Sequence, residues 1–417
     1  MLRGNAARPA RTADRACAFH SPLLALTRTD TLTGNTISIL EKLVAFDTTS
    51  DRSNLPLLDY VRDYLAGFGV ASTLIHDETG EKANLVATIG PVGEGGIALS
   101  GHTDCVPVTG QPWESDPFTL TRKGDRLYGR GTCDMKGFDA AVLAAVPAMV
   151  AAELKTPIHI IFSYDEEIGC VGVRRAIAQL GQDLPMPLAV IVGEPTNMKV
   201  VDAHKGIADF ETTVIGVEAH SSVLDTGANA ILAALPLMLE LIEIREQAKA
   251  IGDYTGRFDP PYSSIHIGKI KGGTASNIVP RECRFVWEVR AIPGFHARDV
   301  CDRLMGFAVR EILPGLHAIS EETDISTVQL VSAPALAPDP GSLAERIALR
   351  AAGLNETQTV SYMTEAGLFQ RAGAPAIVCG PGSIAQAHKP NEFIEIAQLE
   401  ACQAFLGKII EIAREGA

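Results

Sequence analysis

The sequence predicts an α/β protein with a mixed sheet, in which a smaller α+β domain is inserted into a larger domain. Three observations lead to this prediction. Short apolar runs alternate with helix-like segments as far as about residue 200, which is typical of a layered α/β fold. The order then changes to β-α-β-β-α, which suits a small antiparallel sheet covered by two helices. From about residue 335 the first pattern returns.

The first part of the larger domain begins with two helix patterns. Ile37, Leu40 and Val44 share one helical face, and a second apolar face runs from Leu57 to Phe68. A long apolar helix is expected at 136–154, and strands are expected at 84–89, 97–100, 158–164 and 188–193. In sheets of this type ligands collect at the carboxyl ends of the strands. Several acidic and histidine residues lie there.

The inserted domain is expected between residues 204 and 333, and the larger domain comprises 31–203 and 334–417. Within the insertion, helix patterns cover 228–248 and 297–312, and strand patterns cover 208–215, 264–270, 283–289 and 326–331. The chain closes with a helix pattern at 397–414. A domain joined at only two crossings suggests a lid that opens and closes.

Composition narrows the class of protein. The chain has 417 residues and a formal net charge of −14, which argues against nucleic acid and anionic membranes as partners. Eight scattered cysteines without CxxC spacing suit reduced thiols in a cytosol. No segment approaches the roughly 20 apolar residues of a membrane span. We therefore expect a cytoplasmic protein.

The first thirty residues are a separate case. Arg3, Arg8, Arg11 and Arg15, with few acids beside them, resemble a weak transit peptide, but the apolar region of a secretory signal is missing. We expect residues 1–30 to be a disordered tail or a start-site extension.

Histidine and acidic residues gather in five short segments. Most follow strand patterns, and together they contain His102, Asp104, Asp134, Glu166, Glu167, Glu194 and His388. Each segment alone is a weak signal, because a lone HxD is more often a polar turn and paired glutamates are usually solvated. Here apolar strands precede the acids, and two carboxylates at a buried strand end are costly without a cation. Cys133 has no base placed beside it, so we interpret it as structural.

The order and spacing of these segments resemble the di-zinc family of deacylases and exopeptidases. The matching segments are GHTDCVPVTGQPWESDPF (101–118), YGRGTCDMKG (128–137) and GPGSIAQAHKPNEF (380–393). The resemblance covers nearly the whole chain from about residue 35, and it implies a zinc exopeptidase-like catalytic domain. It also implies one or two Zn²⁺ ions per subunit, for which Co²⁺ can substitute.

The resemblance implies a role for each matched residue of the metal centre. His102 would bind one zinc and His388 the other, with Asp134 bridging them. Glu167 and Glu194 would complete the two sites, and Glu166 would be the general base. Asp104 would orient His102, since a zinc-bound imidazole usually donates its other N–H to an oxygen. The family also has a cis peptide after the bridging aspartate, here Asp134–Met135.

The resemblance extends to the inserted domain. The segment around His220 resembles a family motif whose histidine stabilises the oxyanion, although an isolated histidine is more often a surface residue. In related dimers this histidine reaches the partner's active site, so a homodimer through the lid domain is expected, with His220 acting in cis or in trans. Asn277 and Arg290 resemble substrate contacts. Arg290 could clamp an α-carboxylate or form a surface ion pair. Glu365 could pair with an ornithine δ-ammonium or only support the site.

The function expected from this resemblance is the metal-dependent hydrolysis of N2-acetyl-L-ornithine to acetate and L-ornithine, in arginine biosynthesis. A zinc-activated water would attack the amide, with Glu166 as general base. Desuccinylation of succinyl-diaminopimelate, general N-acyl amino acid hydrolysis and dipeptide cleavage remain alternatives, because they would use the same metal centre. A non-catalytic binding protein on the same fold is an alternative of another class.

Overall fold

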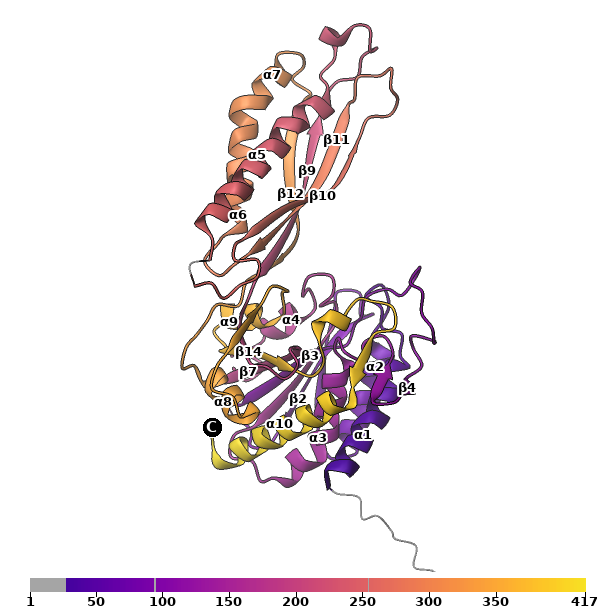
Figure 1. The fold of residues 1–417 in the computed structure, drawn as a ribbon, viewed down its shortest axis with the longest axis vertical. Coiled ribbons are helices and arrows are strands. Elements are labelled where there is room, and N and C mark those ends of the chain that lie inside the picture. Colours follow the sequence, from indigo (N-terminus) through magenta and orange to yellow (C-terminus); the bar gives the residue numbers. More distant parts are fainter. Residues whose placement is uncertain (1–27, 94, 254) are drawn as a thin grey trace, which may run out of the picture.

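The computed structural model of this protein describes residues 28–93, 95–253 and 255–417. It has two lobes, a larger one that contains both ends of the described chain and a smaller one above it (Figure 1). The tail predicted for residues 1–30 lies almost entirely outside the described residues. The chain passes between the lobes just before β9 and just after β12.

The large lobe is built on an eight-stranded sheet with the order β1-β2-β6-β3-β7-β14-β8-β13. β3 runs parallel to β6 and β7, whereas β1 and β2 are antiparallel. The sheet is therefore mixed, and the predicted fold class is confirmed. Its strands are β1 (Ser72–His76), β2 (Ala83–Ile89), β3 (Ile97–His102), β6 (Ile158–Ser163), β7 (Ala189–Pro195), β8 (Val201–His204), β13 (Gln358–Val360) and β14 (Ala376–Gly380).

Helices cover both faces of this sheet, which is why its central strands β3, β6, β7 and β14 are buried along their whole length. One face packs against α1 (Arg28–Val44), α2 (Leu55–Ala66), α3 (Lys136–Ala151), α8 (Leu343–Ala352) and α10 (Ile396–Glu415). The other face packs against α4 (Val173–Ile177) and α9 (Ala366–Arg371). A separate sheet has the order β15-β5-β4, from β4 (Thr121–Lys123), β5 (Arg126–Tyr128) and β15 (Phe393–Glu395).

The small lobe is an antiparallel sheet of order β10-β11-β9-β12, with helices on one face (Figure 1). Residues on β9 alternate strictly between buried and half-exposed, so none of the described helices covers the second face of the sheet. The strands are β9 (Gly206–Ile215), β10 (Ser264–Gly272), β11 (Glu282–Ala291) and β12 (Asp324–Ala333). The helices are α5 (Ala230–Ile251), α6 (Ala297–Phe307) and α7 (Leu313–His317).

Trp287 lies at the centre of the small lobe. Its ring stacks on Phe210 at 4.4 Å between centroids, and its indole N–H donates to Thr212 at 2.9 Å. The lobe therefore has a hydrophobic core of its own, distinct from the cores of the large lobe. The predicted limits of an inserted domain at 204 and 333 stay a prediction.

Sequence patterns located the long elements better than the short ones. The helix predicted at 297–312 continues as α6, a π turn at Ala308–Ile312 and α7, so it ends later than expected. The helix predicted at 136–154 ends earlier, at Ala151. The short strands β1, β4, β5, β8, β13, β14 and β15 were not predicted, and neither were α4, α8 and α9. Two short 3₁₀ turns complete the described elements, at Leu224–Thr226 and Ile384–Gln386.

Within the described residues, no helix combines the length and apolar character that crossing a membrane requires. The seven described cysteines are all free and buried. Cys133 donates its thiol to the carbonyl of Ser383, and burial raises the pKa of this thiol, which suits a structural residue rather than a nucleophile.

Candidate metal centre and active site

The candidate metal ligands lie at the carboxyl ends of three adjacent strands and on two loops beside them. His102 ends β3, Glu166 and Glu167 follow β6, and Glu194 lies near the end of β7. Because β3 pairs in parallel with both β6 and β7, these three strand ends meet at one edge of the sheet. Asp134 comes just before α3 and completes the group. The ligand atoms of His102, Asp134 and Glu167 all lie within 4.8 Å of one another.

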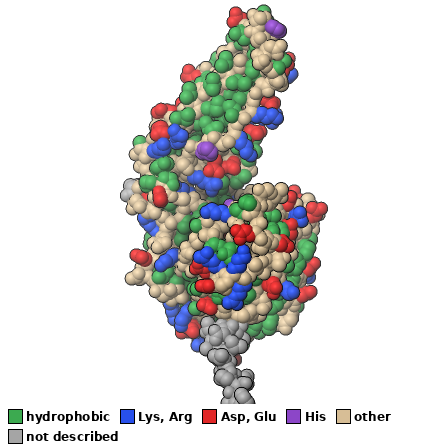
Figure 2. Space-filling model, turned by 45° about the vertical axis from the view of Figure 1, so that its right-hand side comes forward, with side chains coloured by type: hydrophobic (Ala, Val, Ile, Leu, Met, Phe, Trp, Pro, Cys, Tyr) green, Lys and Arg blue, Asp and Glu red, His purple; other side chains and the backbone are tan. Residues whose placement is uncertain are grey.

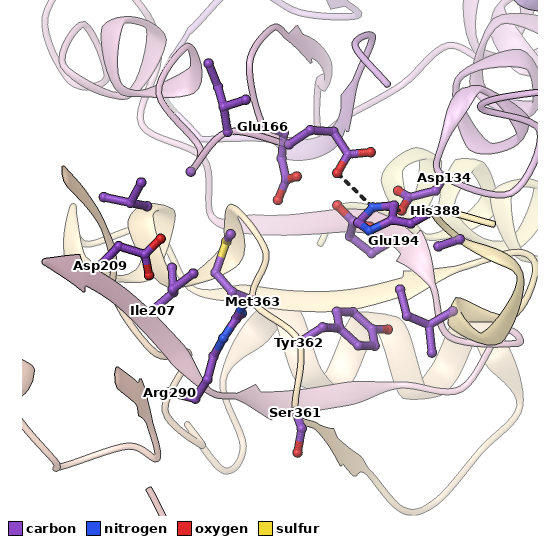
Figure 3. Close-up of a pocket in the computed structure, with 16 residues that line it drawn as sticks. Asp134, Glu166, Glu194, Ile207, Asp209, Arg290, Ser361, Tyr362, Met363 and His388 are labelled. Carbon is purple, nitrogen blue, oxygen red and sulfur yellow. Dashed lines mark ion pairs between the residues drawn. The ribbon is translucent and has the colours of Figure 1, made fainter. Parts of the chain in front are cut away.

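Asp134 lies between the two histidines. Its Oδ1 is 3.1 Å from Nε2 of His102, and its Oδ2 is 3.4 Å from Nε2 of His388. Each histidine also has a glutamate beside it. Glu194 Oε1 is 3.7 Å from His102 Nε2, and Glu167 Oε2 is 2.9 Å from His388 Nε2 (Figure 3). The arrangement is therefore two half-sites that share one aspartate.

The electrostatics of this cluster show an excess of buried negative charge. Burial raises the pKa of Glu166 and of Glu194 well above the usual range, and neighbouring carboxylates raise both further. Burial and Asp134 raise the pKa of Glu167 to about 7. Burial also opposes ionisation of Asp134, but hydrogen bonds from His102 and His388 outweigh it and lower its pKa.

These residues fit divalent metal ions. Buried carboxylates so close together are unfavourable unless a cation compensates them. The donors are imidazole nitrogens and carboxylate oxygens, which Zn²⁺ accepts and which Co²⁺ also accepts. The cluster can therefore hold metal ions. Glu166 belongs to it as well, because its ligand atom lies within 4.8 Å of those of His102 and Glu194.

Asp104 connects the strand end of β3 to the glutamate loop. Its carboxylate accepts hydrogen bonds from the backbone amides of Glu166 at 3.1 Å and Glu167 at 3.2 Å, and from Ser50 Oγ at 2.8 Å. Its Oδ1 is 3.4 Å from Nδ1 of His102. Burial opposes ionisation of Asp104, but the hydrogen bonds from His102, Ser50 and the amide of Glu166, together with the charge of His102, outweigh burial and lower the pKa of Asp104. Asp104 thus fixes His102 and Glu166 relative to each other.

Glu392 organises the loop that carries Asp134, and the sequence analysis assigned it no role. Its buried carboxylate accepts from Arg130 Nη1 at 2.7 Å and from the backbone amides of Gly131, Cys133 and Asp134. The only signal for this role was its position in the matched segment 380–393. The peptide Asp134–Met135 in the same loop is cis, as the resemblance implied.

A cavity of about 660 Å³ lies between this cluster and the small lobe (Figure 3). The large lobe contributes the metal cluster, the segment 361–363 and Ile168. The small lobe contributes Ile207, Asp209, Arg290 and Val331. The cavity is therefore shared by the two lobes.

Arg290 is the only predicted substrate contact among the described residues that lines this cavity. Its Nε and Nη2 donate to the two carboxylate oxygens of Glu288, both at 2.9 Å. Nη1 has no partner among the described residues. The predicted clamp and the predicted ion pair are therefore compatible, since one guanidinium edge remains free for a ligand.

The structure does not bring His220, Asn277 or Glu365 to the cavity. His220 and Asn277 lie together on the exposed surface of the small lobe, where the amide of Ser221 donates to the carbonyl of Asn277 at 3.0 Å. Glu365 is 1% exposed and accepts hydrogen bonds from Ser100 and Ser163, beneath the ends of β3 and β6. Burial raises its pKa to about 7. In this position Glu365 supports the strand ends rather than facing a ligand.

Replacing Glu392 by Gln should destabilise the protein by about 3–5 kcal/mol, because it leaves the buried Arg130 without its charge partner. Urea unfolding of the purified variant and of the wild-type protein would measure this difference in the free energy of unfolding. Glu395→Gln is a matched control. Glu395 pairs with Arg126 at the exposed surface of the sheet β15-β5-β4, and loss of this ion pair should leave the free energy of unfolding almost unchanged. Equal effects of the two variants would contradict the role given to Glu392.

Comparisons with known proteins identify the family of this chain. The model of peptidase family M20/M25/M40 matches residues 98–412. The acetylornithine deacetylase of Myxococcus xanthus is 39% identical over 383 residues, covering 89% of this chain and 95% of the relative. The enzyme of the same name from Proteus mirabilis is 33% identical over 384 residues, covering 88% and 92%.

Solved structures show the same fold. A metallo-carboxypeptidase of the M20 family from Sulfolobus solfataricus aligns with a TM-score of 0.70 at 19% identity, covering 91% of this chain and 99% of the other. A dinuclear metal-binding peptidase of the M20 family from Bacillus subtilis aligns with a TM-score of 0.66 at 15% identity, covering 93% and 99%. The chain belongs to peptidase family M20/M25/M40 and is a metal-dependent amidohydrolase.

Proposed function

We propose that this chain hydrolyses N2-acetyl-L-ornithine to acetate and L-ornithine, a step of arginine biosynthesis. The observation that carries amide hydrolysis is the cluster of buried carboxylates in which Asp134 lies between His102 and the more exposed His388, with Glu166 close by. The substrate rests on the relatives from Myxococcus xanthus and Proteus mirabilis, both named acetylornithine deacetylase.

The residues of this site would have different roles: some would bind metal ions, and others would position these ligands or take part in the reaction. His102, Asp134 and Glu194 would hold one ion, and His388, Asp134 and Glu167 would hold a second. When bound, Zn²⁺ or Co²⁺ would polarise the amide carbonyl and make a water molecule more acidic. Asp104 keeps His102 in its orientation, and Glu392 keeps Asp134 in its loop.

Glu166 is free to act as the general base. Its only side-chain hydrogen-bond partner among the described residues is the thiol of Cys170, at 3.3 Å from Oε1. It lines the cavity beside the metal cluster, and burial raises its pKa, so this carboxylate accepts a proton more readily than an exposed glutamate does. The same carboxyl group can then pass the proton to the leaving amine.

The small lobe supports a homodimer. Four apolar side chains are exposed on one side of α5, where residues three or four positions apart share a face. They include Leu232 and Leu239, at 62% and 64% exposure, together with Leu235 and Ile242. Figure 2 shows hydrophobic side chains gathered on the visible face of this lobe. A second copy packed on α5 would cover this surface. His220, which lies outside its own subunit's cavity, would then act in the partner's active site.

Two further features belong to this proposal. The lobe from 204 to 333 would act as the lid over the cavity, because it contributes Arg290 and Asp209 to the lining. A cytoplasmic location is supported by the seven free, buried cysteines, which suit a reducing compartment.

With added Zn²⁺ or Co²⁺, the purified protein should release ornithine from N2-acetyl-L-ornithine faster than it cleaves N-succinyl-diaminopimelate or N-acetyl-L-methionine. The measurement is kcat/KM for each substrate. A clear preference for either of the other substrates would discard acetylornithine and keep the metal-dependent chemistry. Inactivity towards all of them and towards dipeptides would favour the binding-protein alternative.

Glu166→Gln should lower kcat by something like 10²–10⁴-fold while the protein retains its metal, because the variant loses the base and keeps all five proposed ligands. Glu167→Gln is the matched control on the neighbouring residue, and it should lose metal as well as activity. Metal content by elemental analysis, beside the rate, distinguishes the two roles. Metal loss in Glu166→Gln would show that Glu166 is a ligand instead.

Mixing His220→Ala with Glu166→Gln subunits should restore activity that neither variant has alone, if His220 acts across the dimer. One active site of each mixed dimer then contains both wild-type residues. The mixture stays inactive if His220 acts within its own subunit.

The double substitution Leu232→Glu and Leu239→Glu should produce monomers in sedimentation analysis. Val150→Glu, which changes an exposed apolar residue on the large lobe, should leave the dimer intact.

A further inference from the structure

Asp209 is a carboxylate of the small lobe that faces the active-site cavity, and its Oδ1 has no hydrogen-bond partner among the described residues. It lies on β9, on the sheet face that no helix covers, opposite Glu288 on β11. It lines the cavity together with Arg290 (Figure 3). Its Oδ1 is buried and has no hydrogen-bond partner, and Asp209 forms no ion pair with any described residue.

None of the described charged groups around Asp209 forms an ion pair with it. Glu288 and Arg290 neutralise each other through two hydrogen bonds of 2.9 Å. Lys269 on β10 acts on Asp209 electrostatically but forms no ion pair with it. Burial and the neighbouring Glu288 raise the pKa of Asp209, while Arg290 and Lys269 oppose this rise. A partly buried carboxylate without a hydrogen bond is unfavourable, and a cationic group of a ligand would compensate it.

The surroundings of Asp209 also suit a hydrocarbon chain. Ile207 and Val331 flank it on the same side of the small lobe, and Met363 and Ile168 belong to the same cavity lining. Figure 3 shows Ile207 and Met363 beside Asp209, away from Asp134 and His388. The cavity therefore offers a metal cluster in one part, and an apolar wall with one unpaired carboxylate in another.

We propose that Asp209 selects substrates whose side chain ends in a primary ammonium group, by pairing with that group while Nη1 of Arg290 binds the α-carboxylate. The inference rests on the proposed hydrolysis of N-acyl amino acids at this site. Glu365, for which the sequence left open a contact with the δ-ammonium or a purely supporting role, is buried beneath β3 and β6 and does not line the cavity. Glu288 is occupied by Arg290.

The test compares two substrates of nearly equal shape, N2-acetyl-L-ornithine and N-acetyl-L-norleucine, in which a methyl group replaces the ammonium group. Asp209→Asn keeps the size of the side chain and removes its charge. It should lower kcat/KM for acetylornithine by about 10–100-fold, the effect of one hydrogen bond to a charged group. The kcat/KM for acetylnorleucine should be unchanged, which also shows that the variant is folded.

Glu211→Gln is the matched control. Glu211 lies two residues further along β9 on the same sheet face, 3.7 Å from Arg284, and does not line the cavity. Glu211→Gln should leave kcat/KM unchanged for both acetylornithine and acetylnorleucine. An equal loss on both substrates in Asp209→Asn, or no loss on either, would overturn the inference while the proposed function stands. A wild-type enzyme that cleaves acetylnorleucine but not acetylornithine would overturn both.

Discussion

The close approach of Asp134, Glu166, Glu167 and Glu194 is the constraint on which the rest of this structure depends. Parallel pairing of β3 with β6 and β7 brings three strand ends together, and each strand end supplies at least one ligand-type side chain. Such a group of carboxylates is unfavourable in a buried environment without a cation. Residues around the cluster hold the segments that carry these carboxylates in place.

Three further buried acids serve this purpose without belonging to the cluster. Asp104 connects the amides of the glutamate loop to His102. Glu392 binds three amides of the loop before α3 and the buried Arg130. Glu365 accepts from two serines near the ends of β3 and β6. Each carboxylate crosslinks segments that are far apart in the sequence, so the positions of the metal-centre residues depend on the whole large lobe.

The two lobes contribute different chemistry to one cavity. The large lobe provides a rigid cluster on the ends of buried strands, which suits the reacting centre. The small lobe provides charged side chains on the uncovered face of an antiparallel sheet, where Asp209 and Arg290 alternate with core residues. Such surface positions can vary without disturbing the stack of Trp287 on Phe210. A division of this kind allows the same metal centre to serve different substrates.

The sequence by itself determined the fold class, because periodicity marks long elements, and it predicted the members of the cluster, because His102, Asp134 and Glu166 occur in segments with a recognisable order. It did not reveal short strands such as β13 and β14, whose three to five residues carry too little periodicity. Tertiary structure alone decided which acids face the cavity. Glu365 and Asp209 are both acidic residues whose neighbours in the sequence do not show which of them faces the cavity. Long-range packing buries Glu365 against Ser100 and Ser163, whereas the alternation of β9 leaves Asp209 on the open face beside Arg290.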